Sequence, residues 1–291
     1  MPFVVRALAA LCLGVIGAFS VSMAEAAQVA PNIVFINSGE RGAELTIRNG
    51  AQTPIEVEVR IVFGYEDTDG AGRVRAVYPE SSDGERSAAE WIRAYPRRAV
   101  IPPESRQSIR LFSRAPSGIE AGEYWARIQV ESRPTQIEAQ DAAGGEDVQV
   151  RVGVTTRQRI PLFVRVGEAS ASLAVGEARA RLRQDAREDR APQRHIEVRY
   201  RTRLAGNAAF LGTMQARLER EGRILATQEV PLAVFVPGIR RVRIPLDEEL
   251  SAADLRQARL ILEARREHPA INSRDLLAGR ALRWEGPLAL E

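Results

Sequence analysis

The sequence predicts an all-β protein made of two β-sandwich domains joined by a short hinge. Apolar residues recur at every second position in many short segments, which is typical of strands with one buried face. Turn-forming Gly, Pro, Asn and Asp separate these segments and leave little room for helices. About 265 residues remain after a predicted leader, and this length suits two domains of ordinary size.

Residues 1–26 have the three parts of a cleavable signal peptide. Arg6 precedes an apolar run, and Ala24 and Ala26 form an Ala-x-Ala cleavage site. The run is shorter than the roughly 20 residues that cross a bilayer, and a retained anchor is the alternative. Cys12 lies within the run and is the only cysteine. We therefore expect an exported chain with no disulfide and no membrane span.

Domain 1 is expected over residues 27–167 and domain 2 over residues 168–291. The boundary falls in residues 166–178, a tract of small residues and glycines that is typical of a hinge. Alternating segments predict strands in both domains, three of them within residues 96–130. Residues 78–93 are expected to form an exposed loop.

Residues 250–269 fit two local structures. Ser251 followed by Asp254 indicates a capping box and a helix. A similar tract in domain 1, however, combines a loop of small and acidic residues with an alternating strand. We expect one helical turn over residues 252–256, then a strand over 257–264. A last strand is expected near the C-terminus with Trp284 packed inward.

The strongest strand signal spans residues 148–165. Valines occupy alternate positions in its first half, and Pro161 in its second half indicates an edge or a bulge. A polar, glycine-bearing loop at residues 137–147 comes before it. An alternating valine strand is usually one strand of a closed core. Its place after a loop favours an exposed strand instead, which self-association or loop residues would cover.

The sequence contains no motif that indicates an enzyme. There is no His-Glu-x-x-His, no Gly-x-Ser-x-Gly and no Lys from which to build a phosphate-binding loop. His195 and His268 are flanked by charge and are expected on the solvated surface. Acidic pairs in residues 67–69 and 146–147 indicate either soluble loops or a bare calcium site. We expect no enzymatic activity, no cofactor and no metal.

The charge pattern argues against nucleic acid as a partner. The net charge is +3 and the pI is near 9.5. The arginines alternate with glutamates, however, and do not gather around aromatic residues as a nucleic-acid platform requires.

Two tracts in domain 1 resemble the PapD-like periplasmic chaperones of pilus assembly. They are residues 98–111, Arg-x-Val-Ile-Pro-Pro-x-Ser-x-Gln-Ser-Ile-Arg-Leu, and residues 122–127, Gly-Glu-Tyr-Trp-Ala-Arg. The resemblance implies two immunoglobulin-like sandwiches in the periplasm. It implies a chaperone of fimbrium biogenesis that binds pilin-like subunits by donating a β-strand to complete their fold. An outer-membrane usher is a further implied partner.

The same resemblance assigns roles to individual residues. Arg159 corresponds to a basic position that holds the terminal carboxylate of the subunit. Asn32 stands where the family has a second basic residue, and this departure weakens the implied carboxylate anchor because Asn carries no charge. The donor positions of the strand are Val148, Val150, Val152 and Val154.

Two other classes of function remain open. The chain is alternatively a secreted protein of two immunoglobulin-like domains that binds a partner or builds a surface assembly without chaperone activity. An exported enzyme is the third class, and it requires a set of convergent polar groups that the sequence does not indicate.

Overall fold

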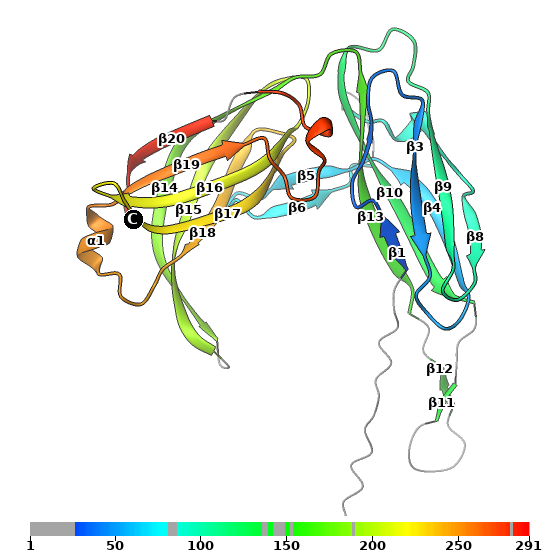
Figure 1. Ribbon diagram of the computed structural model, residues 1–291, viewed down its shortest axis with the longest axis horizontal. Helices are drawn as coiled ribbons and strands as arrows, with labels where there is room; N and C mark the ends of the chain where they lie inside the picture. The colour runs from blue at the N-terminus through cyan, green and yellow to red at the C-terminus, as the bar shows by residue number, and fades with distance from the viewer. Residues whose placement is uncertain are drawn as a thin grey trace, which may run out of the picture.

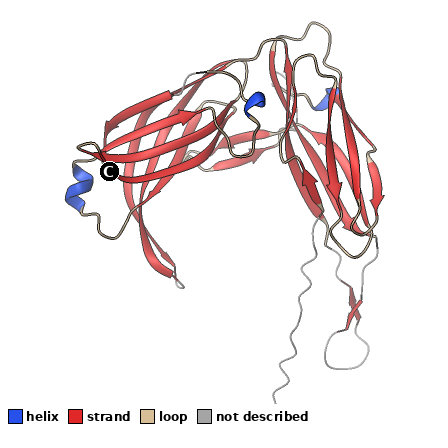
Figure 2. Cartoon of the chain, in the orientation of Figure 1, coloured by secondary structure: helices blue, strands red, loops and turns tan. Residues whose placement is uncertain are grey.

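The computed structural model describes residues 27–80, 86–135, 139–141, 149–151, 154–187, 190–279 and 282–290. Nearly all of its regular structure is strand (Figure 2), so the predicted all-β class is confirmed. The predicted signal peptide, residues 1–26, lies outside the described residues. No helix within the described part of the chain is long and apolar enough to cross a membrane.

Domain 1 is a sandwich of two sheets. One sheet has the strand order β1-β3-β9-β7, and the other has the order β2-β13-β10-β4-β8. Their inward residues form one aliphatic core, in which Ile47, Val57 and Ile128 have no exposed surface. The strands are β1 Gln28–Ala30, β2 Val34–Ile36, β3 Gly42–Arg48, β4 Ile55–Val62, β7 Ile92–Tyr95, β8 Arg98–Ile101, β9 Arg106–Ser113, β10 Gly122–Pro134 and β13 Thr156–Val166.

Two hairpins and a short helix extend this sandwich. The strands β5 Tyr65–Thr68 and β6 Val74–Val77 pair with each other as a hairpin. The strands β11 Ala139–Asp141 and β12 Gln149–Arg151 form a separate two-stranded sheet. The 3-10 helix η1, Ala89–Trp91, leads into β7.

Domain 2 is a second sandwich. Its sheets have the orders β14-β15-β18 and β17-β16-β19-β20, and Ile196, Met214 and Leu262 are fully buried between them. The elements are β14 Ala171–Arg187, β15 Arg190–Gly206, β16 Phe210–Arg220, β17 Arg223–Val234, β18 Gly238–Pro245, α1 Ala252–Arg256, β19 Arg259–Arg265, η2 Ser273–Asp275 and β20 Leu282–Pro287.

The segment with two candidate structures contains both, in the predicted order. The helical turn α1 begins at Ser251, whose side chain accepts from the backbone of Asp254, and the reciprocal contact completes the capping box. The strand β19 follows and pairs with β16 and β20. Trp284 of β20 is half-buried against the core of domain 2, so its inward packing is also confirmed.

The link between the two sandwiches is shorter than the predicted hinge, because β13 ends at Val166 and β14 already begins at Ala171. Two other local predictions were wrong because tertiary contacts cover residues that look solvated in the sequence. The predicted exposed loop contains Ala88, which is fully buried and donates its backbone N–H to the carbonyl of Trp125. His195 is 6% exposed, because it lies in β15 between its cross-strand neighbours Arg183 and Pro245.

The two sandwiches are set at an angle and meet at one end (Figure 1). The hairpin β5–β6 lies between them and contacts β17 and β18 of domain 2. A third apolar cluster also joins the domains. It contains Trp125 and Phe163 of domain 1 with Leu211, Phe235 and Ile271 of domain 2.

Candidate functional site

One edge of the five-stranded sheet is only partly covered. Over its full length β13 pairs with β10, but β2 pairs with β13 only at residues 162–164. No described strand pairs with the other side of β13 over residues 156–161. Pro161 lies in this uncovered part, as predicted for a proline that interrupts a strand. The exposed main-chain groups of such an edge can accept another strand.

The predicted continuous strand over residues 148–165 is divided. β12 ends at Arg151 and belongs to a different sheet from β13, which begins at Thr156. Val154 lies between the two, outside any strand, and is 53% exposed. Val150 lies in β12 opposite Gln140. Val148 and Val152 lie outside the described residues.

Arg159 lies on the uncovered part of β13 and points away from the core. Its Nε donates to Oε1 of Gln129 at 3.0 Å, and its guanidinium lies 4.2 Å from the ring centroid of Tyr78. These contacts orient the cation at the outer face of the sheet. Asn32 is exposed and precedes β2, two residues before the Val34 that pairs with Leu162. Within the described part of the chain Asn32 makes no hydrogen bond to Arg159, so their joint role as a carboxylate anchor stays a prediction.

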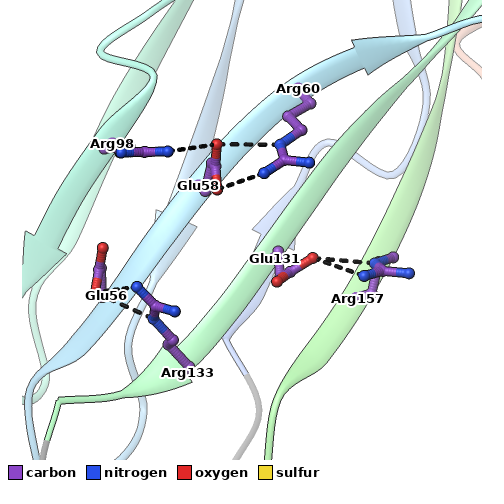
Figure 3. Close-up of polar contacts among 7 residues, drawn as sticks. All are labelled: Glu56, Glu58, Arg60, Arg98, Glu131, Arg133 and Arg157. Carbon is purple, nitrogen blue, oxygen red and sulfur yellow. Dashed lines mark hydrogen bonds and ion pairs between the residues drawn. The ribbon is translucent and has the colours of Figure 1, made fainter.

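Ion pairs cross the same outer face next to this edge (Figure 3). Arg157 of β13 binds Glu131 of β10 at 2.9 Å, and Arg133 of β10 binds Glu56 of β4 at 2.9 Å. Glu58 of β4 accepts hydrogen bonds from Arg60 and from Arg98 of β8. These two arginines, Arg60 first, lower the pKa of Glu58 to about 2. The pairs are exposed, so they contribute little stability, but they give the sheet an ordered, charged outer face.

Further along β10 and β13, the outer face enters a cleft of about 300 Å³ between the domains. Arg127 of β10 and Arg240 of β18 line it and are only 4% and 3% exposed. Burial lowers the pKa of both guanidinium groups. Apolar side chains from both domains form the rest of the wall, among them Ile33, Phe163, Leu211, Val230, Phe235 and Ile271.

The two buried arginines are incompletely paired. The Nη2 of Arg127 lies 3.5 Å from Oε1 of Glu66, and Nη1 of Arg240 donates to Oγ1 of Thr68 at 2.6 Å. The Nε atoms of both arginines are buried without a hydrogen-bond partner among the described residues. A buried donor without an acceptor costs about 1–3 kcal/mol, and more when it is charged. The cleft is therefore suited to an anionic or strongly accepting group that enters from outside.

Aromatic rings of both domains pack together beside the cleft, and Phe163 and Phe235 line it. The edge of Trp125 meets Phe235 at a centroid distance of 4.9 Å, and Phe163 stacks on Phe235 at 5.8 Å and on Phe35 at 4.9 Å. Because Phe235 belongs to domain 2 and the other three rings to domain 1, this stack ties the domains together.

A buried charged network fixes the same junction. Glu123 of β10 has no exposed surface and accepts from Arg165, Trp125 and the backbone of Ala209. Burial raises the pKa of Glu123, and these donors act in the opposite direction. Arg165 also donates to Asn37 and, across the junction, to the carbonyl of Asp275 at 2.7 Å. The network therefore joins β10 and β13 of domain 1 to domain 2 by hydrogen bonds.

Sequence reasoning did not identify Arg127, Arg240 or Glu123 as site residues. Alternation places Arg127 and Glu123 on the outer face of β10, where charged residues are normally solvated. Domain 2 covers part of that face, and this contact is not visible in a local pattern. One sequence signal could have pointed to Arg127 and Glu123, because they lie among Tyr, Trp and Ala in the same strand. The structure buries that strand along almost its whole length.

No family model and no curated protein matches the chain. A solved structure of the YadV chaperone is 14% identical, with 90% of this chain and 99% of that chain covered and a TM-score of 0.40. The CsuC–CsuE chaperone and tip-subunit complex from Csu pili of Acinetobacter baumannii is 13% identical, covering 89% and 97%, with a TM-score of 0.43. The class 5 fimbriae chaperone CfaA is 10% identical, covering 89% and 98%, with a TM-score of 0.41. Each of these three similar structures contains a chaperone.

Proposed function

We propose that this protein is a periplasmic chaperone that binds pilus-type or fimbria-type subunits and completes their fold with a β-strand. The observation that carries the proposal is the uncovered edge of β13, which leads directly into a cleft with incompletely paired cations. A subunit that lacks a strand has an apolar groove between two open sheet edges. Strand addition gives those edges main-chain hydrogen bonds and fills the groove with alternate side chains.

The residues proposed to fill that groove are Val148, Val150, Val152 and Val154. Support comes from Val154, which is exposed and immediately precedes the uncovered edge. An apolar residue at such a place has no core to join in the isolated protein. It gains burial when a partner pairs with the edge, about 1.5–3 kcal/mol for a fully buried side chain of this class.

The cleft is proposed to receive the terminal carboxylate of the subunit. Arg159 lies at the rim, two residues before the Pro161 that lines the cleft on the same face of β13. Asn32, where the resemblance implies a second basic residue, carries no charge, so Arg159 is proposed to supply the charge of this anchor. Arg127 and Arg240 lie deeper and offer donors that lack partners. A carboxylate would satisfy them with charge-assisted hydrogen bonds.

Site-directed photo-crosslinking in exporting cells tests the proposal. A photoreactive amino acid replaces Val154, and the matched control carries it at Val100, a valine of β8 in the same domain that is 60% exposed. We expect Val154 to capture an exported subunit with an incomplete sheet, and Val100 to capture much less of it. The captured chain is identified by mass spectrometry.

A second pair of variants tests strand donation itself. Val154→Asp should abolish capture while Val100→Asp leaves it intact, because only the first places a carboxylate in an apolar groove. Both variants should keep the thermal midpoint of the wild type. Equal capture at the two positions would contradict strand donation. It would favour a two-domain binding or surface-assembly protein without chaperone activity.

A further inference from the structure

The cleft between the domains has an apolar wall beside its two buried arginines. Phe163 of domain 1 and Leu211 and Phe235 of domain 2 line it, and each is at most 6% exposed. The volume of about 300 Å³ is at the small end of the range for ligand sites in proteins. The cleft therefore has room for one large residue and not for a longer segment of chain.

The polar part of the cleft is formed by Arg127 and Arg240, which keep unused donors. Arg127 has Glu66 as its acidic neighbour, at 3.5 Å from Nη2, and its Nε has no hydrogen-bond partner in the described part of the chain. Arg240 donates from Nη1 to Thr68 and from Nη2 to the carbonyl of Val236 at 3.5 Å. Its Nε is likewise buried without a partner among the described residues. A carboxylate that enters the cleft gains charge-assisted hydrogen bonds from these groups.

The acidic residues near this pair of arginines do not neutralise both. Glu66 lines the cleft with a side chain that is 36% exposed, so water solvates part of it. Asp67 accepts from the backbone of Thr68 and lies 3.9 Å from Arg75 within its own hairpin. The cleft thus holds two buried cations against one partly solvated carboxylate, and a ligand with one negative charge balances them.

The other titratable groups on the wall leave this balance unchanged. Arg241 also lines the cleft, but its Nη1 donates to Glu197 of β15 at 3.3 Å. Burial lowers the pKa of His268 below its usual value, so this imidazole on the wall is neutral at neutral pH. Burial raises the pKa of Tyr200, so its phenol is uncharged. The charge of the wall therefore favours an anion.

The uncovered edge of β13 determines which part of a partner reaches the cleft. Pro161, the last residue of that edge, and Ile33, which precedes β2, both line the cleft. A strand that pairs with residues 156–161 in the direction of β13 therefore arrives at the cleft with its C-terminal end. A chain that ends there brings a free carboxylate and one side chain. A chain that continues brings further peptide groups and no charge.

We propose that the cleft selects partner chains whose last residue is large and apolar, such as phenylalanine or leucine. This selection depends on the proposed function, because a partner strand paired with β13 delivers the residue. Its carboxylate accepts from the unused donors of Arg127 and Arg240, and its side chain displaces water from Phe163, Leu211 and Phe235. A terminal glycine leaves the apolar wall hydrated, and a terminal aspartate places a second charge against it.

Fluorescence anisotropy with labelled peptides tests the selection on the wild-type protein. Each peptide alternates Thr and Val over a length that covers residues 156–161, and only its last residue differs, as Phe, Leu, Gly or Asp. The Phe and Leu peptides should bind about tenfold or more tightly than the Gly peptide, since burial of such a side chain favours binding by that factor. The Asp peptide should bind no better than the Gly peptide, and amidation of the Phe peptide should weaken its binding.

Variants at two isoleucines test whether the selection is made in the cleft. Ile271→Gln makes the apolar wall polar, so the preference for the Phe peptide over the Gly peptide should fall to about threefold or less. The matched control is Ile224→Gln, which changes an isoleucine of β17 that is 53% exposed and lies outside the cleft wall. It should keep the preference of the wild type. An equal loss of preference in both variants would overturn the proposal.

The peptide series has outcomes that overturn the selection directly. They are equal affinity for all peptides with a free carboxylate, and tighter binding of the Gly or the Asp peptide. Decanoate offers a carboxylate and an apolar chain without a strand, so it should compete only weakly with the Phe peptide. Tighter binding of decanoate would assign the cleft to a small amphiphile and overturn the selection as well.

Photo-capture at Val154 distinguishes failure of the selection from failure of the proposed function. Capture of a subunit together with equal affinities in the peptide series would leave strand donation in place and remove only the selection. Loss of both capture and peptide preference would remove both.

Discussion

Arg165 donates a 3.0 Å hydrogen bond from its Nε to Oε2 of Glu123, a carboxylate that has no exposed surface. The same guanidinium reaches the carbonyl of Asp275 in domain 2 through Nη2. One arginine of β13 therefore neutralises a buried charge of its own sheet and holds the neighbouring domain. The contact joins β10 and β13, the two strands of domain 1 that contribute Arg127, Pro161 and Phe163 to the cleft.

Arg165→Ala should lower the free energy of unfolding by about 3–5 kcal/mol, because it leaves Glu123 buried without a counter-charge. Urea denaturation measures the change. The control is Arg157→Ala, which removes an exposed arginine of the same strand that is paired with Glu131. It should cost less than about 1 kcal/mol. Similar losses of unfolding free energy in the two variants would contradict this prediction, because the buried ion pair would then stabilise the fold no more than the exposed one.

Glu58 should make stability depend on pH in the acid range. Its pKa is about 2 in the folded chain against a usual value of 4.5, so ionised Glu58 stabilises the fold above the higher value. This contribution is lost as the pH falls from about 4.5 towards about 2. Glu58→Gln should therefore lose less stability than the wild type across that window, as measured by urea denaturation at several pH values. Parallel curves for the two proteins would contradict the lowered pKa.

Gly72 should be sensitive to a side chain because the hairpin lies against domain 2 there. Its φ is +78°, and an added Cβ would come within 2.8 Å of the carbonyl carbon of Arg240. Gly118 has a φ of +77° with open space around it, so it is a matched control for backbone strain alone. Gly118→Ala should cost about 1–2 kcal/mol, and Gly72→Ala about 1–3 kcal/mol more. Thermal unfolding compares them, and equal costs would mean that the hairpin does not pack tightly.

Arg159→Ala should weaken binding of the subunit's C-terminal peptide by roughly 2 kcal/mol if Arg159 anchors a carboxylate. Arg157→Ala, two residues away on the same face, should have little effect. Asn32→Arg should strengthen binding of a peptide with a free carboxylate but not of the amidated peptide. Calorimetric titration at two salt concentrations measures each case, and equal affinities in all variants would exclude the anchor.

Arg127→Met should weaken capture of the subunit while leaving the free energy of unfolding almost unchanged or higher. The buried guanidinium has donors without partners, and its neighbour Glu66 stays 36% exposed and can be solvated when the arginine is gone. The variant should therefore unfold within about 1 kcal/mol of the wild type or be more stable, while capture of the subunit falls. A large loss of stability would assign Arg127 to the fold and remove it from the site.

The alternating pattern predicted most strands of both domains, since one buried face leaves a period of two in the sequence. The order of α1 and β19 was also predicted, because both signals are local in the sequence. The capping residues indicate the helical turn, and the inward Leu260 belongs to the alternating strand. The flanking charges wrongly predicted a solvated His195, which neighbouring strands bury. Arg127 was missed for a similar reason, because domain 2 covers a face that looks solvated in β10 alone.

The third apolar cluster gives the protein an optical reporter of its own. Trp125 is one of only three tryptophans in the chain, and its indole donates to Glu123 and packs against Phe235, which lines the cleft. A ligand that enters the cleft changes the water and the charge near this ring, and indole emission responds to both. With Trp91 and Trp284 replaced by Phe, the intensity and wavelength of emission would report occupancy of the cleft without any attached dye.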